Sequence, residues 1–368
     1  MTSRPRLDRV HVVGTGLIGT SLGIALSRKG VEVTLEDLSP TAVALARDLG
    51  AGTPRPPEGP APDLVVVATP PDVVAGAVLD ALERFSAAAV TDVASVKGAI
   101  LSALHASGAD LTRYCGSHPM AGRERSGAIS GRADLFEGRA WVVTPTAETD
   151  PRVVELLDEV ARQVGSVTTR LAPESHDAAV AAVSHVPQVA ASLVAARLTD
   201  LPDTAVALAG QGLRDVTRIA ASEPQLWTQI LAGNAGAVRA VLGDLAADLG
   251  GLIDALDAFG GDPGADAPGA RATLARVIAD GNTGHARIPG KHGAGPTAYA
   301  TVRVLIPDRP GQLGRLFQDI GDEGINIEEF RIDHGLGQAF GLAEIDVLPA
   351  SAPTLAAALD RRGWRLHD

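Results

Sequence analysis

The stretch His11-Val-Val-Gly14-Thr-Gly16-Leu-Ile-Gly19 decides the fold of the first part of this chain. It follows a short apolar run and opens a helical pattern. Gly14 permits a tight turn, Gly16 lets a pyrophosphate approach the backbone, and Gly19 lets the helix pack closely on the strand. The start of that helix would offer unpaired N–H groups and a partial positive charge to phosphates. Three glycines alone also fit an ordinary strand–helix turn, but their context favours a dinucleotide-binding loop.

An acidic residue about 20 positions further on completes this pattern. It is Glu36 or Asp37, at the end of the second predicted strand, and its carboxylate would accept hydrogen bonds from ribose hydroxyls. Neither Leu38 nor Ser39 offers a cation for a 2′-phosphate, which favours NAD over NADP. We prefer Asp37 because Asp-Leu-Ser-Pro resembles the usual turn at a strand end; the alternative is a solvated turn acid. The cofactor site also includes Leu17, Ile18 and Thr69 in this prediction.

Four short β-rich runs in the first 167 residues are each followed by turn or helix residues. They are Val10–Val13, Val31–Leu35, Leu64–Ala68 and Ala89–Asp92. Strands that alternate with helices indicate βαβ units. We therefore predict a Rossmann-type, doubly wound parallel sheet in an NAD-binding domain over residues 1–167.

Residues 168–285 change character, because strand signals become rare and apolar residues recur at helical spacing. The clearest case is Val238–Leu256, with Leu242, Leu245, Leu249, Leu252 and Leu256. Such a stripe must be buried in a bundle or against another subunit. We predict an all-helical substrate and dimerisation domain, and hence a homodimer.

Two Gly/Pro-rich stretches, Phe259–Ala270 and Gly290–Pro296, have the composition of domain boundaries. Residues 286–297 are predicted to be a linker. After it, TVRVLI alternates as a strand, PDRPG turns the chain, and a helix over Gln312–Glu323 ends at Gly324. These signals predict a small α+β domain over residues 298–368.

Composition restricts the function further. The formal net charge of −12 disfavours nucleic-acid binding, which needs a basic face. The single cysteine, Cys115, cannot form an internal disulfide, which suits the cytoplasm.

Two stretches, Val10–Ser27 and Ala178–Ala196, are uncharged, but glycines interrupt the first and polar residues interrupt the second. We therefore expect neither a signal peptide nor a membrane span.

Polar residues follow two later strands of the predicted sheet, in Thr91–Gly98 and Gly116–Gly122. Ligands of open α/β sheets bind outside the carboxyl ends of the strands. Within the second segment, Pro119 restricts the backbone of His118 to extended conformations. Taken alone, each segment is equally well a strand-end loop, with a histidine that is hydrogen-bonded for structural reasons.

Together these segments resemble the prephenate/arogenate dehydrogenases of tyrosine biosynthesis. The family's order and spacing of motifs recur in GTGLIG, TDVASVKG, GSHPMAGRERSG, AVAAVSHVPQ and GLRDVTRIAASEPQLW. The last block, with IPDRPGQLGRL and GINIEEF, resembles an ACT domain, a small module that often binds amino acids. The resemblance spans nearly the whole chain, and its middle motifs are specific to the family.

The resemblance implies a set of site residues. His118 is the base that takes the hydroxyl proton, and Ser95 hydrogen-bonds either that histidine or the substrate hydroxyl. Arg218 holds a substrate carboxylate. Glu124 gates or polarises the pocket, although surface charge explains it equally well. Many members carry histidine where Gln188 stands, so this departure puts recognition of the substrate side chain in question. No metal is expected.

Several charged residues have alternative interpretations. Arg214 and Arg218 lie four apart on one predicted helical face, where like charges repel by about 0.2–0.5 kcal/mol, and a bound carboxylate would offset that repulsion. Asp215 is the other candidate partner of Arg218. We expect Lys97 to be a helix-start cation near solvent. For His176 and His185 we expect core or supporting roles.

The resemblance therefore implies an NAD-dependent prephenate dehydrogenase that releases 4-hydroxyphenylpyruvate and carbon dioxide. Its closest alternative uses arogenate and forms tyrosine directly, and the sequence does not separate the two. A non-catalytic, NAD-binding amino-acid sensor is a third possibility, which the presence of Ser95, His118 and Arg218 disfavours. The ACT-like block implies tyrosine as an effector.

Overall fold

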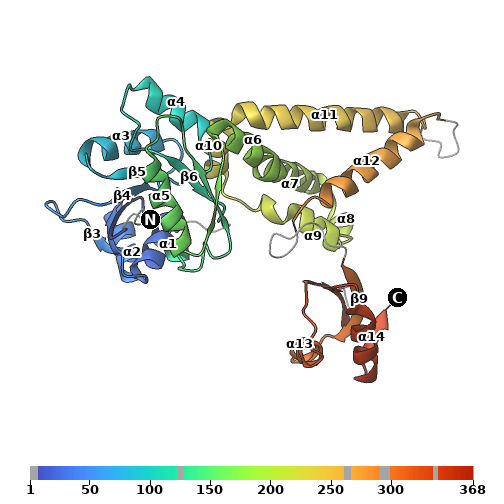
Figure 1. The fold of residues 1–368 in the computed structure, drawn as a ribbon. Coiled ribbons are helices and arrows are strands. Elements are labelled where there is room, and N and C mark those ends of the chain that lie inside the picture. The colour runs from blue at the N-terminus through green and yellow to red at the C-terminus, as the bar shows by residue number, and fades with distance from the viewer. Residues whose placement is uncertain (1–6, 123–126, 261–266, 290–298, 335–338, 368) are drawn as a thin grey trace. The chain divides into compact units, whose positions relative to one another are not determined.

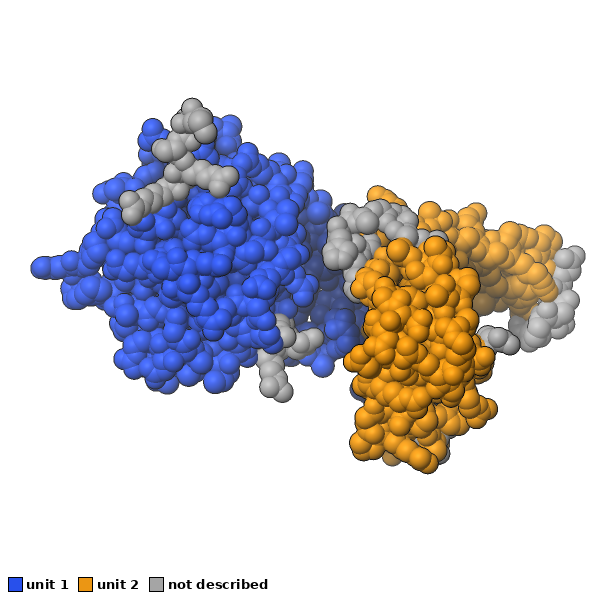
Figure 2. All heavy atoms as spheres, turned by 60° about the horizontal axis from the view of Figure 1, so that its bottom comes forward, with its two compact units in different colours: residues 1–201, 216–245 blue, residues 202–215, 246–368 orange. Residues whose placement is uncertain are grey.

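The computed structural model describes residues 7–122, 127–260, 267–289, 299–334 and 339–367. The chain divides into two compact units (Figure 2). One consists of residues 1–201 with 216–245, and the other of residues 202–215 with 246–368. The first unit holds the glycine loop, His118 and Arg218.

A five-stranded parallel sheet lies at the centre of the first unit (Figure 1). Its strands are β1 (Arg9–Val13), β2 (Glu32–Glu36), β3 (Thr53–Pro54), β4 (Leu64–Val67) and β5 (Ala89–Asp92). Their spatial order is β3-β2-β1-β4-β5. Val12 of β1 faces Leu35 on one side and Val66 on the other. The strand order therefore reverses between β1 and β4, which is where such sheets bind nucleotides.

Helices cover both faces of this sheet. Leu64 and Val66 of β4 pack into one core, with residues of α1 and α5, whereas Val65 and Val67 pack into a second core, with α3 and α4. The helices are α1 (Leu17–Ser27), α2 (Pro40–Asp48), α3 (Val74–Arg84), α4 (Gly98–Ala106) and α5 (Pro151–Gln163). Adjacent residues of one strand thus face opposite cores. This confirms the predicted doubly wound sheet.

Local sequence explains how helix α2 begins. The side chain of Ser39 accepts a hydrogen bond from the backbone N–H of Ala42, at 3.3 Å, and Pro40 occupies the first helical position. A serine cap followed by proline is a strong start signal, because proline at that position loses no helical hydrogen bond. Helix α2 therefore starts directly after the acidic turn at Asp37.

A second, three-stranded sheet consists of β6 (Gly116–Pro119), β7 (Ala140–Thr144) and β8 (Val167–Arg170), with the short 3-10 turn η1 (Ala128–Ser130) between β6 and β7. Strand β6 is antiparallel to β7, and Trp141 of β7 is fully buried against Phe136. The sequence places His118 in a loop after a strand, but the structure places it inside β6. The reason is that its backbone pairs with Val142 of β7.

A run of helices follows. It comprises α6 (Pro173–Val180), the π-helical turn η2 (Ala181–His185), α7 (Val186–Ala196), η3 (Arg197–Asp200), α8 (Asp203–Val206), α9 (Gln211–Thr217), η4 (Arg218–Ala220), α10 (Pro224–Gly233), α11 (Ala235–Asp257) and α12 (Ala270–His285). Pro187 cannot donate a hydrogen bond to the carbonyl of Val183. This break in the helical ladder favours the wider turn η2, of a kind often found at functional sites.

The predicted apolar stripe lies along α11. Val238 is buried, whereas Leu245, Leu249, Ile253 and Leu256 are each about half exposed in the single chain. A row of exposed large apolar side chains on one helix marks a surface that associates with another surface.

The stretch Pro173–Asp200 has the length and mean hydropathy of a membrane span, and the bent pair α10 with α11 passes the same test. Within that stretch, however, Asp177 accepts hydrogen bonds from the backbone at the start of α4, and the ring of His185 contacts the Asn234 amide. Buried polar contacts of this kind join the stretch to other parts of the first unit.

The C-terminal part forms a four-stranded antiparallel sheet with two helices. Its elements are β9 (Ala300–Pro307), α13 (Gln312–Asp322), β10 (Glu329–His334), β11 (Phe340–Val347), α14 (Ala352–Arg361) and β12 (Arg365–His367), with strand order β10-β11-β9-β12. Leu316 of α13 and Leu355 of α14 are buried in one core with Val304. This confirms the predicted small α+β domain; the stretch Gly290–Pro296 lies outside the described residues.

Candidate active site

The glycine loop joins β1 to α1 and is shaped by close approaches. Gly14 has a φ of +100°, and a Cβ there would lie 2.5 Å from the carbonyl oxygen of Ala68. A Cβ on Gly19 would lie 2.0 Å from the carbonyl oxygen of Gly14. Gly16 precedes α1, and no other part of the described protein lies within 4 Å of where its Cβ would be. The fold thus requires glycine at positions 14 and 19. At Gly16, by contrast, the space next to the backbone is open.

The two candidate ribose acids lie in different surroundings. Asp37 accepts hydrogen bonds from the backbone N–H and the hydroxyl of Thr15, at 2.7 and 3.0 Å, so it borders the glycine loop. Glu36 instead forms a two-pronged pair with Arg84 and contacts His11. The hydrogen bond from Arg84 holds the pKa of Glu36 below its usual value. Geometry therefore favours Asp37 for the ribose and gives Glu36 a structural role.

Thr69 follows β4, next to the residue whose carbonyl crowds Gly14. Its hydroxyl oxygen is buried and has no hydrogen-bond partner in the described part of the chain. An unpartnered buried hydroxyl is costly unless something else supplies its partner. Leu17 and Ile18, at the start of α1, pack partly buried against the core. Three adjacent strands, β2, β1 and β4, are thus followed by Asp37, the glycine loop and Thr69. This arrangement fits a dinucleotide.

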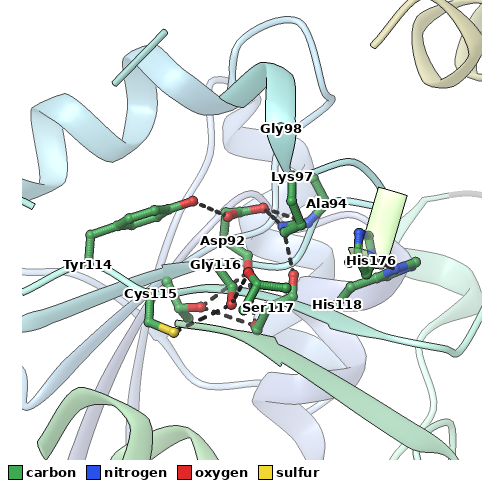
Figure 3. Close-up of polar contacts among 12 residues, drawn as sticks. Asp92, Ala94, Lys97, Gly98, Tyr114, Cys115, Gly116, Ser117, His118 and His176 are labelled. Carbon is green, nitrogen blue, oxygen red and sulfur yellow. Dashed lines mark hydrogen bonds and ion pairs between the residues drawn. The ribbon is translucent and has the colours of Figure 1, made fainter. Parts of the chain in front are cut away.

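A buried charge cluster lies beyond the end of β5 (Figure 3). The Lys97 ammonium forms an ion pair with Asp92 and donates to the backbone carbonyl of Ser117 at 2.8 Å. The Tyr114 hydroxyl donates to the same Asp92 carboxylate at 2.7 Å. Burial, the nearby Asp92 charge and this hydrogen bond keep the pKa of Tyr114 well above its usual value. The expectation of a solvent-facing Lys97 is wrong, because the lysine is 1% exposed and neutralises a carboxylate in the core.

Cys115 lies beside this cluster. Its thiol is 1% exposed, and burial raises its pKa to about 12. A thiol of this kind stays protonated at neutral pH and takes no part in nucleophilic chemistry.

His118 is half-buried and pairs with His176 of α6 (Figure 3). Its Nδ1 lies 2.9 Å from Nε2 of His176, and Nδ1 of His176 lies 2.8 Å from Oδ1 of Asp177. Burial holds the pKa of His118 well below its ordinary value, and the neighbouring His176, Lys97 and His185 lower it further. His118 is therefore neutral at physiological pH, the form required of a general base.

Ser95 lies in the loop between β5 and α4 and is half-buried. His118 shares a hydrogen bond with His176, and no hydrogen bond joins it to Ser95 among the described residues. Ser95 is expected from the sequence to bond either His118 or the substrate hydroxyl, and the contact with the substrate hydroxyl stays a prediction.

Arg218 is exposed and begins the 3-10 turn η4. Helix α9 ends at Thr217, so Arg214 and Arg218 do not share one α-helical face as the spacing predicts. Just after this turn, the Ser222 hydroxyl donates a hydrogen bond to the backbone carbonyl of Ile219 at 2.7 Å. Asp215 accepts a hydrogen bond from the Gln211 amide at 2.8 Å.

Gln188 is a buried residue of α7, 6% exposed. Its amide oxygen accepts a hydrogen bond from Ser222 at 3.3 Å, and its amide nitrogen donates to Ser192 at 3.4 Å. Gln188 thus ties α7 to the turn that carries Arg218. Glu124 lies outside the described residues.

Asn234 joins two parts of the helical region, and the sequence does not predict this role. Its amide donates to the backbone carbonyl of Asp177 at 2.8 Å and lies 3.2 Å from Nδ1 of His185. Burial lowers the pKa of His185. The sequence indicates this role only weakly, by a polar residue between two apolar helices and by a proline two residues after His185.

Two consecutive parts of the chain match family models of known proteins. Residues 22–170 match the nucleotide-binding domain of prephenate dehydrogenase, and residues 172–262 match its dimerization domain. The probable prephenate dehydrogenase NovF of Streptomyces niveus is 38% identical over 357 residues, which cover 96% of this chain and 98% of that protein. The chain belongs to the prephenate dehydrogenase family.

Solved structures of this family resemble the chain as well. Prephenate dehydrogenase of A. aeolicus, in complex with hydroxyphenyl propionate and NAD+, is 27% identical with a TM-score of 0.65, covering 76% of this chain and 99% of that one. The arogenate dehydrogenase of Synechocystis is 26% identical with a TM-score of 0.60, covering 75% and 99%. As a member of the prephenate dehydrogenase family, the chain is an oxidoreductase with a nucleotide-binding domain.

Proposed function

We propose that this protein is an NAD-dependent prephenate dehydrogenase. The observation that carries the proposal is His118, a half-buried imidazole kept neutral by burial and by the neighbouring His176, Lys97 and His185, in a chain of this family. A neutral, hydrogen-bonded histidine is the group that can remove a hydroxyl proton near pH 7.

The reaction transfers one hydride and one proton, and His118 can carry out the proton transfer. When NAD is bound, it supplies the acceptor for the hydride on C4 of prephenate. His118 takes the C4 hydroxyl proton, so that the O–H electron pair forms a carbonyl. The bond from C1 to its carboxylate then breaks, carbon dioxide leaves, and its electron pair makes the ring an aromatic phenolate. His118 returns the proton to that oxygen, which gives 4-hydroxyphenylpyruvate.

The other site residues position the substrate in this proposal. Arg218 holds a carboxylate by paired hydrogen bonds, and Ser95 contacts the reacting hydroxyl. Gln188 contacts the remainder of the substrate and fixes the turn that carries Arg218, and Glu124 gates or polarises the pocket. Orientation is a large share of the task, because aromatisation itself drives the loss of carbon dioxide.

NAD is the proposed cofactor. The open space at Gly16 admits the pyrophosphate, Asp37 accepts hydrogen bonds from the adenosine ribose, and Thr69 gains a partner for its buried hydroxyl. Leu17 and Ile18 start the helix whose N-terminus faces the phosphates.

Arogenate is the second candidate substrate, favoured by the similarity to the Synechocystis arogenate dehydrogenase. It carries an amino group where prephenate carries a keto group. Gln188 is neutral and can donate or accept a hydrogen bond, so it suits either side chain.

Further proposals concern assembly and regulation. The exposed stripe on α11 and the match to a dimerization domain support a homodimer. The C-terminal β9–β12 domain is proposed to be an ACT domain with tyrosine as its effector. Absence of an internal disulfide partner for Cys115 suits a cytoplasmic enzyme.

The test is NADH formation by the purified protein with prephenate and arogenate in parallel. We expect a preference for prephenate, with loss of most turnover in His118→Asn and nearly unchanged NAD affinity. A preference for arogenate would keep the mechanism and change the substrate. NAD binding without turnover of either compound would favour the sensor, and full activity of His118→Asn would refute the role of His118.

A further inference from the structure

The carboxylate of Asp177 is anchored by the backbone at the start of α4. Its Oδ1 accepts from the N–H of Lys97 at 2.9 Å, and its Oδ2 accepts from the N–H of Gly98 at 2.7 Å. Helix α4 has no capping side chain of its own, so a residue 79 positions further along the chain caps it. This anchoring fixes the position and orientation of Asp177.

The same hydrogen bonds keep Asp177 ionised. Burial raises the pKa of Asp177, but the hydrogen bonds from His176, Gly98 and Lys97 outweigh it and leave the pKa below its usual value. The positive end of the α4 dipole favours the anion as well. An ionised carboxylate can only accept hydrogen bonds.

The protons of the two histidines follow from that fact. Because Oδ1 of Asp177 accepts, Nδ1 of His176 must carry a proton, and the ring tautomer with that proton has a lone pair on Nε2. The 2.9 Å contact to His118 requires one proton between the rings, so it sits on Nδ1 of His118. His118 is left with an unprotonated Nε2, free to take a proton.

We propose that His176 and Asp177 are positioning residues that hold His118 in the tautomer with a basic Nε2. The proposal rests on the proposed function, in which His118 receives the substrate's hydroxyl proton. Once His118 is protonated, its Nδ1–H donates to His176, and the anchored carboxylate stabilises the positive charge through that ring. A carboxylate that orients a catalytic histidine plays the same part in hydrolytic triads; here one further imidazole transmits the effect.

Lys97 does not compete for this role. Its ammonium is occupied by Asp92 and by the carbonyl of Ser117, so only its backbone N–H serves the Asp177 anchor. His185 is also held separately, by the amide of Asn234. The order of contacts from α4 to the base is therefore Gly98, Asp177, His176 and His118.

Three variants of the full-length protein test the proposal. His176→Leu removes both ring nitrogens, His176→Gln places an amide oxygen near the position of Nε2, and Asp177→Asn removes the charge. His105→Gln, an exposed histidine on α4, is the matched control. Each variant is first checked for the wild-type circular dichroism spectrum and for NAD binding.

The decisive readout is the tautomer of His118, from long-range 1H–15N NMR spectra of protein labelled at histidine. His118→Asn identifies its signals by their loss. We expect Nδ1–H in the wild type and His105→Gln, a mixture of tautomers in His176→Leu and Asp177→Asn, and recovery in His176→Gln. A wild-type pattern in His176→Leu would overturn the proposal, as would Nε2–H in the wild type.

Kinetics give the second readout. We expect kcat of His176→Leu to fall by roughly 10²-fold, within the range a positioned base contributes, with KM changed by about 2-fold at most and partial recovery in His176→Gln. A raised KM with unchanged kcat would assign His176 to substrate binding and overturn the proposal. Wild-type inactivity with prephenate and arogenate would count against the proposed function alone, because the NMR readout needs no turnover. Should His176→Leu fail to fold, Asp177→Asn and His176→Gln carry both readouts.

Discussion

Oδ2 of Asp177 lies 2.7 Å from the backbone nitrogen of Gly98, and a Cβ on that glycine would lie 2.9 Å from the same oxygen. The carboxylate therefore reaches the start of α4 only because residue 98 has no side chain. Gly98, the glycine of the VKG motif, thus affects His118 through Asp177 and His176, although it contacts neither histidine ring.

Gly98→Ala is expected to displace the Asp177 carboxylate and to lower kcat, with little change in NAD affinity. Alanine is the better helix former, so any loss of activity must come from the displaced contact. Gly76→Ala, in the exposed part of α3 with no atom within 4 Å of the new Cβ, is the control, and it should gain about 0.5–1 kcal/mol of stability at unchanged kcat. Equal kcat in both variants would show that the Asp177 anchor does not affect turnover.

The pH dependence of kcat/KM should reflect the lowered pKa of His118. Burial, and the neighbouring His176, Lys97 and His185, hold this pKa well below 6.5, while Asp177 acts through His176. The neutral form is active, so kcat/KM should be flat through neutrality and fall only at pH values well below 6.5. Initial rates from roughly pH 5 to 9 test this. An acid limb centred at or above 6.5 would contradict the buried geometry of His118.

Stability should also depend on pH. The pKa values of His11, His118 and His185 are all lowered in the folded protein, chiefly by burial. The unfolded chain therefore binds more protons just below pH 6.5, and the free energy of unfolding should decrease as pH falls through that region. Urea titrations in this window measure the slope. Each histidine contributes up to about 1.4 kcal/mol per pH unit, so His118→Asn should lessen the slope and the exposed His105→Gln should not.

Lys97→Met should destabilise the first unit by about 3–5 kcal/mol, because it leaves the Asp92 carboxylate buried without its counter-charge. Urea unfolding followed by tryptophan fluorescence measures the loss. Arg47→Met, which removes one partner of an exposed pair with Asp48, is the matched comparison and should cost far less. Similar losses in the two variants would mean that the buried pair has no special weight.

Two glycines of the loop should respond differently to alanine. At Gly19 the new Cβ meets the backbone of Gly14, so Gly19→Ala should lose about 1–3 kcal/mol of stability. At Gly16 the Cβ meets no described protein atom, so Gly16→Ala should keep its stability and bind NAD roughly 10-fold or more weakly. Calorimetric titration with NAD and thermal unfolding separate the effects. Undiminished NAD affinity in Gly16→Ala would refute the placement of the pyrophosphate.

The parts of the fold that follow from local rules could be predicted from the sequence. The four main strands were predicted to within about a residue, because each is a short β-branched run bounded by turn residues. The glycine loop and the acidic turn at Asp37 are likewise local patterns of fixed spacing. Doubly wound topology follows from the alternation of these strands with helices.

The supporting contacts of the site could not be predicted, because they join residues distant in sequence. His118 and His176 are 58 residues apart, and Asp177 reaches α4 across 79. The burial of Lys97 was missed for the opposite reason: its partner Asp92 is only five residues away, and such a pair in a loop usually faces solvent. The break between α9 and η4, after Thr217, has no strong sequence signature either.

The burial of Cys115 makes it a reporter of unfolding for this protein. It is the only cysteine in the chain, and its thiol is both inaccessible and protonated at neutral pH. A thiol reagent can therefore react only after the region between β5 and β6 opens. One labelling event per molecule then times the opening of the segment that carries His118, without any engineered probe.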